Sequence, residues 1–273
     1  MIYQNLTDLP TDYTHIYLSP HLDDAALSCG GMIAAQCAAA ERVLVVTLCT
    51  AAPPANATFS NLALSFHREW GLDPEQVVAA RLEEDSAAIS ILGADSFWAG
   101  MLDAIYRHPG AYHSRETLFA APAPDDPLVS LLHDLINRLG RYLPGAHFYA
   151  PLGIGDHVDH QITYSTALAC AGRQLAFYED APYVMRPGLR AQRLAQLGLE
   201  LQPQIRQIGA TLEQKIASVR AYASQMAELA ASQLGRQATP AEAVELMATT
   251  LRTYALEVDV ASGGAERLWV QVG

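Results

Sequence analysis

The sequence is short of positive charge. Its 17 lysine and arginine residues stand against 29 aspartate and glutamate residues, and the formal net charge is −12. Nucleic acids and anionic membrane surfaces are bound through clustered cations, so the chain is not expected to bind either. No stretch approaches the ~18 uncharged apolar residues of a membrane-spanning helix. A small neutral or cationic molecule remains as the expected ligand. Assembly of the chain into a homo-oligomer is left open.

The sequence also lacks paired cysteines, and its first residues lack the pattern of a secretory signal. Its four cysteines, Cys29, Cys37, Cys49 and Cys170, form no C-x-x-C pair and lie in apolar segments. We therefore expect reduced core cysteines rather than disulfides or a zinc knuckle. The first residues (MIYQNLTDLPTDY) contain no basic segment leading into an apolar one. A secretory signal is thus not expected, and a cytoplasmic location is predicted.

Short strand patterns alternate with helical patterns along most of the chain. Five apolar runs predict strands at His15–Ser19, Arg42–Thr50, Ser96–Leu102, His147–Leu152 and Gln174–Tyr178. Because helical segments separate these runs, the pattern predicts an α/β, Rossmann-like fold with a mostly parallel sheet and helices on both faces. A single domain over residues 1–273 is expected. Its C-terminal segment is expected to be helical, with capping boxes that begin at Thr211 and Thr239.

Two loops follow predicted strands, Ala51–Ser60 and Ile105–Pro127. The carboxyl ends of parallel strands meet at one edge of the sheet, where open α/β folds bind ligands. Both loops are therefore expected to lie over that edge.

The first chemical motif is Ser-Pro-His-Leu-Asp-Asp at residues 19–24. It falls where the first predicted strand ends and a helix begins. His21 and Asp24 are three residues apart, so one turn can direct both at a single point, with Asp23 close by. A hydrolytic metal site needs imidazole and carboxylate ligands and a further carboxylate that accepts a proton from water. The alternative is that both aspartates are acids of a helix start.

The second motif is Gly-Asp-His-Val-Asp-His at residues 155–160, again between a predicted strand and a predicted helix. His157 and His160 are three residues apart. Helix capping would explain Asp156 and Asp159 but not two histidines. Because two motifs of the same topology would meet at one edge of a parallel sheet, the pair indicates a metal-dependent active site.

Together these motifs resemble the PIG-L / LmbE-like N-acetylglucosamine deacetylases, whose signatures are His-x-Asp-Asp after the first strand and His-x-Asp-His later in the chain. Weaker resemblances run through the rest of the sequence. Arg81–Gly93 resembles the family's Arg-x-x-Glu helix, and Leu102-Asp103 resembles its third strand end. The C-terminal helix of the family is matched by Lys215, Tyr222, Ser224 and Gln225.

The resemblance implies a metal-dependent hydrolase that removes the N-acetyl group from an N-acetylglucosamine-type sugar or sugar conjugate. It implies Zn²⁺ as the cofactor, with Fe²⁺ as the alternative metal. The implied metal ligands are His21, Asp24 and His160.

The resemblance also implies the catalytic roles. Asp23 is the general base, and His157, oriented by Asp159, faces the developing oxyanion and the leaving amine. Arg81 and Asp103 are candidate contacts to substrate hydroxyl groups.

For Arg81 the alternative is a structural salt bridge with Glu84 or Asp85 on the same helix. The chain also departs from the family pattern at two places. Some members have an acidic residue where this chain has Cys49-Thr50-Ala51-Ala52, and some have a tyrosine at the position of Gly155.

Three other functions fit parts of the pattern. A deacetylase or amidase could act on a non-sugar amide. Two histidines and a carboxylate also form the metal site of non-haem iron oxygenases, although those sites are usually built on β-barrels. A non-catalytic metal-binding protein is the third alternative, and the additional carboxylate of Asp23 argues against it.

Overall fold

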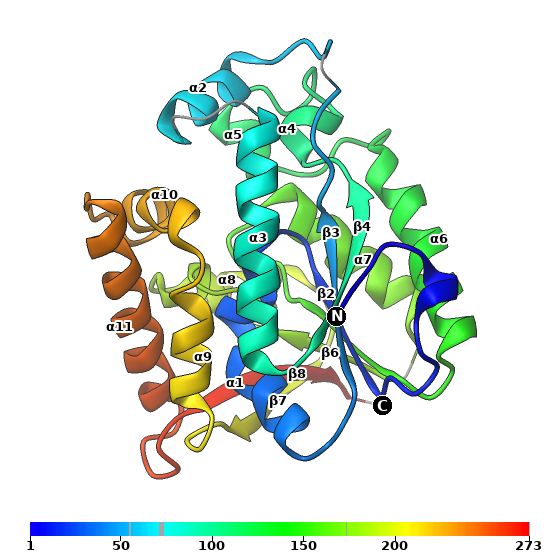
Figure 1. Ribbon diagram of the computed structural model, residues 1–273, viewed down its shortest axis with the longest axis vertical. Coiled ribbons are helices and arrows are strands. Elements are labelled where there is room, and N and C mark those ends of the chain that lie inside the picture. The colour runs from blue at the N-terminus through cyan, green and yellow to red at the C-terminus, as the bar shows by residue number, and fades with distance from the viewer. Residues whose placement is uncertain (55, 71–73, 173, 273) are drawn as a thin grey trace.

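The computed structural model describes residues 1–54, 56–70, 74–172 and 174–272. These residues form one eight-stranded sheet (Figure 1) with the order β1-β4-β3-β2-β5-β6-β8-β7. The neighbours from β1 to β6 are parallel, whereas β8 is antiparallel to both β6 and β7. The strands are β1 (Ile2–Tyr3), β2 (His15–Ser19), β3 (Val43–Cys49), β4 (Asp95–Met101), β5 (His147–Pro151), β6 (Leu175–Tyr178), β7 (Leu201–Gln207) and β8 (Ala265–Gln271).

Helices cover both faces of this sheet, as predicted (Figure 1). One layer contains α1 (Asp24–Ala38), α3 (Pro74–Leu92) and α9 (Leu212–Val219), which pack against one another. The opposite layer contains α6 (Pro127–Tyr142) and α7 (Val158–Cys170). The remaining helices are α2 (Asn61–Trp70), α4 (Ala104–Arg107), α5 (Arg115–Leu118), α8 (Leu189–Gln196), α10 (Ala223–Leu234) and α11 (Pro240–Val258). A search of the described residues finds no helix with the length and apolar character of a membrane span.

The central strands form where the sequence is most apolar. Every residue of β3 is buried, and so are four of the five residues of β2. A strand covered on both faces needs such a continuous apolar run, which is why the sequence predicts these strands to within one residue. Pro20 directly follows β2 and cannot donate a ladder hydrogen bond, so the strand ends there.

The C-terminal part of the chain departs from the prediction. The capping box at Thr239 is present, but Thr211 makes no side-chain cap and donates its hydroxyl proton to the carbonyl of Gly31 instead. Strands β7 and β8 were not predicted. Most residues of β7 are exposed and Pro203 lies within it, so it carries none of the alternation that marks a half-buried strand.

The fold brings the two motifs together at the carboxyl edge of the sheet. β2 and β5 are adjacent and parallel, and α1 and α7 begin just after them. The segment 105–127 lies over this edge, as predicted. It is anchored by a second cluster of buried side chains that joins α2, α4 and α5 to α7, through Leu62, Ile105, Tyr112, Leu118 and Val158.

Candidate active site

The two motifs line one small pocket of about 100 Å³ at this edge. Asp23 is the N-cap residue of α1, and His157 is the N-cap residue of α7. The side chain of Asp23 caps no backbone N–H group, and the carboxylate of Asp24 accepts a hydrogen bond from the backbone of His21, at 2.8 Å. The conventional role of helix-start acids therefore does not explain Asp23. Its carboxylate is directed into the pocket.

Three donor atoms converge beside Asp23. Oδ2 of Asp24 lies 3.2 Å from Nδ1 of His21 and 3.3 Å from Nε2 of His160. Tetrahedral zinc with ligand bonds of about 2.0 Å places its donors about 3.3 Å apart. Within the described part of the chain, Nε2 of His160 is buried and has no hydrogen-bond partner. The residues present thus fit a zinc ion.

A second donor set overlaps the first. Ring nitrogens of His21, His157 and His160 all lie within 4.8 Å of one another. We favour the set with Asp24, because its Oδ2 atom lies within 3.3 Å of a ring nitrogen of both His21 and His160, and because Nδ1 of His157 already accepts a hydrogen bond from the backbone N–H of Asp159, at 3.3 Å.

Each histidine of the favoured set is held by a buried carboxylate. Oδ2 of Asp159 lies 3.0 Å from Nε2 of His21, and Oδ1 of Asp180 lies 2.7 Å from Nδ1 of His160. Such partners fix the orientation of metal-binding histidines and make their free nitrogens better donors. Both partners lie on the far side of the ring from Asp24. This leaves the inner nitrogen of each ring free to bind a metal.

This arrangement corrects the predicted role of Asp159. Its carboxylate was expected to orient His157, but it faces His21 and also accepts a hydrogen bond from Arg107, at 2.5 Å. Only the backbone of Asp159 contacts the ring of His157. A spacing of two residues at a helix start cannot place both groups side by side, because the carboxylate points across the sheet edge toward β2.

Burial and neighbouring charges shift the pKa values of the side chains in the pocket in different directions. Burial alone would raise the pKa of Asp24, but His160 and His21 hold it well below its usual value. For Asp23, burial and the neighbouring Asp24 raise the pKa to about 6. Burial, together with the nearby His21, lowers the pKa of His157 well below its usual value. These shifts favour a neutral imidazole at His157 and a carboxylate at Asp24, and they make the carboxylate of Asp23 easier to protonate than an exposed one.

The proposed substrate contacts also line the pocket. Arg81 makes no hydrogen bond or ion pair with any described residue, and its Nε atom is buried without a partner. Arg81 therefore does not form the salt bridge with Glu84 or Asp85 that was the alternative to a substrate contact. Glu84 binds Ser224 at 2.7 Å, and Asp85 accepts hydrogen bonds from Trp98 and Tyr222. A half-buried arginine whose Nε atom has no partner, beside a reaction pocket, is well placed to bind a ligand.

Asp103 lies at the same pocket, at the start of α4. One of its carboxylate oxygens accepts a hydrogen bond from the backbone of Ile105, and the other lies 3.5 Å from Nε2 of His21. The predicted site residues are therefore gathered at a single place.

Sequence reasoning missed two residues of this site. Asp180 lies just beyond β6, where the rule used for the two motifs would have found it. Tyr183 lines the pocket and packs on Gly155, so that a Cβ atom at position 155 would lie 2.4 Å from its ring. The space beside position 155 is thus filled by the ring of Tyr183, which begins a short 3-10 helix after β6. No local sequence signal points to this packing.

Comparison with known proteins gives the family. The sequence model of PIG-L, described as GlcNAc-PI de-N-acetylase, matches residues 16–171. The chain belongs to this family. It is a hydrolase of the deacetylase class, as the resemblance implied.

Individual relatives agree with this assignment. A 2'-N-acetylparomamine deacetylase of Streptomyces fradiae is 27% identical over 217 residues, which cover 77% of this chain and 72% of the relative. The zinc-inhibited form of a teicoplanin deacetylase superposes with a TM-score of 0.76 at 26% identity, over 95% of this chain and 98% of that one. A deacetylase–teicoplanin complex superposes with a TM-score of 0.75 at 25% identity, over 95% and 99% of the two chains.

Proposed function

We propose that this chain is a zinc-dependent N-deacetylase that hydrolyses the acetamide of a 2-acetamido sugar. The observation that carries the proposal is the convergence of donor atoms from His21, Asp24 and His160 beside the uncapped carboxylate of Asp23. The relatives support a sugar-bearing substrate, since the 2'-N-acetylparomamine deacetylase and the teicoplanin deacetylases act on sugar conjugates. Zn²⁺ is the proposed metal. Elemental analysis of the purified protein would distinguish it from iron, the alternative metal.

In this proposal the metal supplies a water molecule of lowered pKa and a positive charge for the oxyanion. Asp23 accepts a proton from the attacking water. The carbonyl carbon then gains a C–O bond, and its oxygen becomes an oxyanion. Because Nδ1 of His157 is an acceptor, the neutral ring carries its proton on Nε2. This N–H group can donate a hydrogen bond to that oxyanion.

The C–N bond then breaks, and the amine leaves after it takes up a proton, which yields acetate and a free amino sugar. Either the protonated Asp23 or His157, once it has itself taken up a proton as an imidazolium, can supply that proton. Arg81 and Asp103 hold hydroxyl groups of the sugar ring, the first as a donor and the second as an acceptor.

Alanine variants distinguish the general base from the metal ligands, because activity and metal content are measured separately. Asp23→Ala is expected to keep its metal and to lose acetate release by about 10²–10⁴-fold, the usual contribution of a general base. Near-normal activity would rule out Asp23 as the base. Metal content is measured in parallel in Asp24→Ala, His160→Ala and His157→Ala. Loss of metal in the first two alone supports the proposed ligands, whereas retention in Asp24→Ala and loss in His157→Ala would favour the three-histidine set.

A further inference from the structure

We propose that Arg107 is a positioning residue of this active site: it holds the carboxylate of Asp159 against His21 and thereby couples metal binding to the segment 105–127. This inference rests on the proposed metal-dependent function. Among the described residues, the hydrogen bonds of Arg107 reach none of the proposed metal ligands, and its side chain does not line the reaction pocket. Its influence on the site must therefore pass through Asp159.

The guanidinium group of Arg107 joins three separate parts of the chain. Its Nε and Nη2 atoms donate hydrogen bonds to the two carboxylate oxygens of Asp126, at 2.7 and 2.8 Å. Nη1 donates to the backbone carbonyl of Leu102 at 2.7 Å, and Nη2 also donates to Oδ1 of Asp159 at 2.5 Å. Leu102 precedes the segment and Asp126 lies at its end, so one side chain ties both ends of the segment to the first turn of α7.

These contacts are buried. The side chain of Arg107 is 3% exposed, and those of Asp126 and Asp159 are fully buried. Within the described part of the chain, Arg107 is the only lysine or arginine that forms an ion pair with Asp159. A buried carboxylate that loses its cation is strongly destabilised, and only the planar fork of an arginine reaches several acceptors at once. The charged carboxylate of Asp159 therefore depends on Arg107.

The second oxygen of Asp159 acts at the metal site. Oδ2 lies 3.0 Å from Nε2 of His21, and it also accepts hydrogen bonds from the backbone of Ala104 at 3.3 Å and from Sγ of Cys49 at 3.8 Å. Because a carboxylate is planar and rigid, a contact that fixes Oδ1 also fixes the direction of Oδ2. Arg107 thus sets the orientation of the His21 ring, whose other nitrogen faces Asp24.

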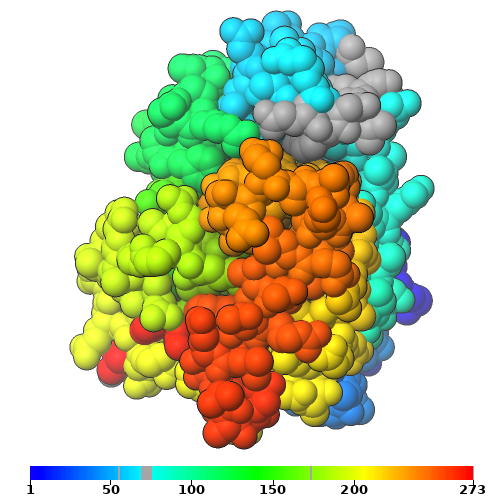
Figure 2. Space-filling model, turned by 90° about the vertical axis from the view of Figure 1, so that its left-hand side faces the viewer, coloured from blue at the N-terminus to red at the C-terminus, as the bar shows by residue number. Residues whose placement is uncertain are grey.

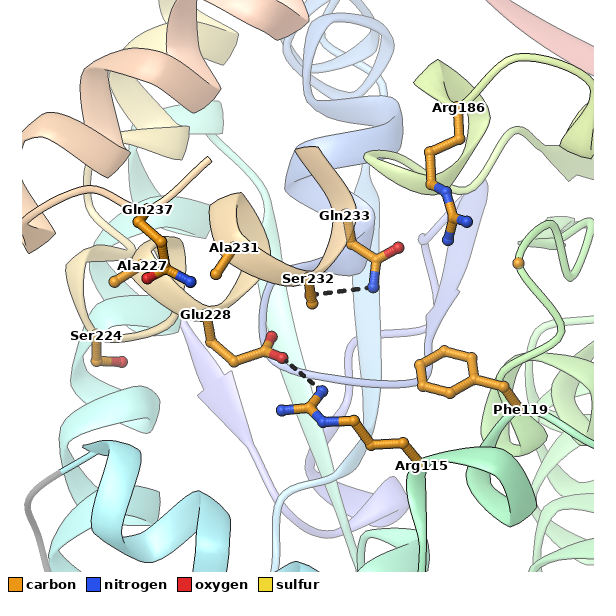
Figure 3. Close-up of a pocket in the computed structure, with 11 residues that line it drawn as sticks. Arg115, Phe119, Arg186, Ser224, Ala227, Glu228, Ala231, Ser232, Gln233 and Gln237 are labelled. Carbon is orange, nitrogen blue, oxygen red and sulfur yellow. Dashed lines mark hydrogen bonds and ion pairs between the residues drawn. The ribbon is translucent and has the colours of Figure 1, made fainter. Parts of the chain in front are cut away.

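The segment that Arg107 closes also forms a wall of the reaction pocket, through Ile105 and Leu118. Its outer side has a second attachment, because Arg115 of α5 forms an ion pair with Glu228 of α10 at 3.0 Å (Figure 3). On the surface of the molecule the green α5 region borders the orange α10 at this place (Figure 2). These two side chains are 43% and 20% exposed, and their contact has no connection to the metal ligands among the described residues. The outer pair therefore provides a matched comparison for Arg107.

The first experiment measures zinc affinity in the folded protein, by competition with a chelator of known affinity. Arg107→Met is expected to bind zinc about tenfold more weakly, at the lower end of the effect of removing a direct partner of a metal-binding histidine, which is about 10–100-fold. Arg107→Lys keeps the charge without the planar fork, and its affinity is expected to lie between those of Arg107→Met and the unmodified chain. A loss of packing alone would not give this partial rescue.

Two controls separate positioning from stability. Lys215→Met breaks another buried ion pair, with Glu266 at 2.6 Å, and is expected to lose stability but to bind zinc as the unmodified chain does. Arg115→Met removes the outer attachment of the segment and is also expected to keep its zinc affinity. Unchanged affinity in folded Arg107→Met, or an equal loss in Arg107→Met and Lys215→Met, would overturn the proposal.

The second experiment follows hydrogen exchange of the backbone amides of segment 105–127, without zinc and at saturating zinc. Coupling between two sites is reciprocal, so zinc is expected to slow this exchange in the unmodified chain by about tenfold, the factor by which Arg107 strengthens zinc binding. In Arg107→Met the exchange is expected to be the same with and without zinc. Where Arg107→Met does not fold, the unmodified chain decides, and exchange that does not respond to zinc overturns the coupling.

Failure of this inference can be told apart from failure of the proposed function. An active, zinc-binding enzyme whose zinc affinity is the same in Arg107→Met would contradict the role of Arg107 alone. A chain that binds no zinc and releases no acetate would contradict the proposed function and this inference together.

Discussion

Oδ1 of Asp180 lies 2.7 Å from Nδ1 of His160, and both side chains are almost completely buried. The contact fixes the ring so that Nε2 points at Asp24. Because Asp180 is not among the residues that line the reaction pocket, we expect it to act on catalysis through His160.

Asp180→Asn is therefore expected to weaken metal binding by about 10–100-fold, the usual effect of removing such a partner. The asparagine can still accept a hydrogen bond but carries no charge. Competition with a chelator of known affinity measures the change. Asp125→Asn, an exposed aspartate that pairs with His108, is the control and should bind metal as the unmodified chain does. Unchanged affinity in Asp180→Asn would contradict the role of this carboxylate.

Tyr183→Phe removes a hydroxyl group that makes no hydrogen bond with any described residue and lines the reaction pocket. We expect kcat/KM to fall by about tenfold or more, with the metal content unchanged, because the substrate loses a donor. Tyr164→Phe is the matched control, since that hydroxyl is buried without a hydrogen-bond partner among the described residues, and its ring packs beside Phe177 and does not line the pocket. Equal activity in the two variants would show that Tyr183 only fills space.

Lys215→Met tests the buried ion pair between α9 and β8. Nζ of Lys215 lies 2.6 Å from Oε1 of Glu266, with side chains 5% and 6% exposed. Breaking a buried pair leaves an uncompensated charge, and a loss of about 3–5 kcal/mol in the free energy of unfolding is expected. Urea denaturation measures it. Arg220→Met, which breaks the exposed pair with Glu245, should change stability little. A similar small change in both variants would contradict the prediction.

Asp85 predicts how stability depends on pH. Burial raises its pKa from 3.8 to about 6, although Trp98 and Tyr222 donate hydrogen bonds to it. The unfolded chain therefore releases this proton at lower pH than the folded chain. The group destabilises the folded chain progressively as pH rises from about 4 to about 6, by roughly 3 kcal/mol in all.

Asp85→Asn removes this titration. Urea unfolding at pH 4.5 and pH 7 should show that the unmodified chain loses more stability over this interval than the variant does. Parallel pH profiles for the two proteins would mean that Asp85 does not titrate in this range.

The sequence alone predicted those parts of the fold and of the site that depend on local residue patterns. The apolar runs of β2 and β3 and the histidines after β2 and β5 are local features, and the structure brings them together as expected. The direction of the Asp159 carboxylate was predicted wrongly, because it depends on which strand lies opposite. The polar strand β7 depends on contacts with β8, and spacing along the chain contains no record of them. Asp180, the partner of His160, could have been found, because it follows β6 directly at the same edge of the sheet.

The packing of Tyr183 on Gly155 has a consequence for redesign. Gly155 has a φ of +92°, and any side chain there would meet the ring, with a Cβ only 2.4 Å from Cδ1 of Tyr183. The two positions therefore behave as one exchangeable unit. Transplanting the aromatic residue that some relatives carry at position 155 requires the simultaneous removal of Tyr183, and either replacement alone leaves the pocket with two rings in one space or with none.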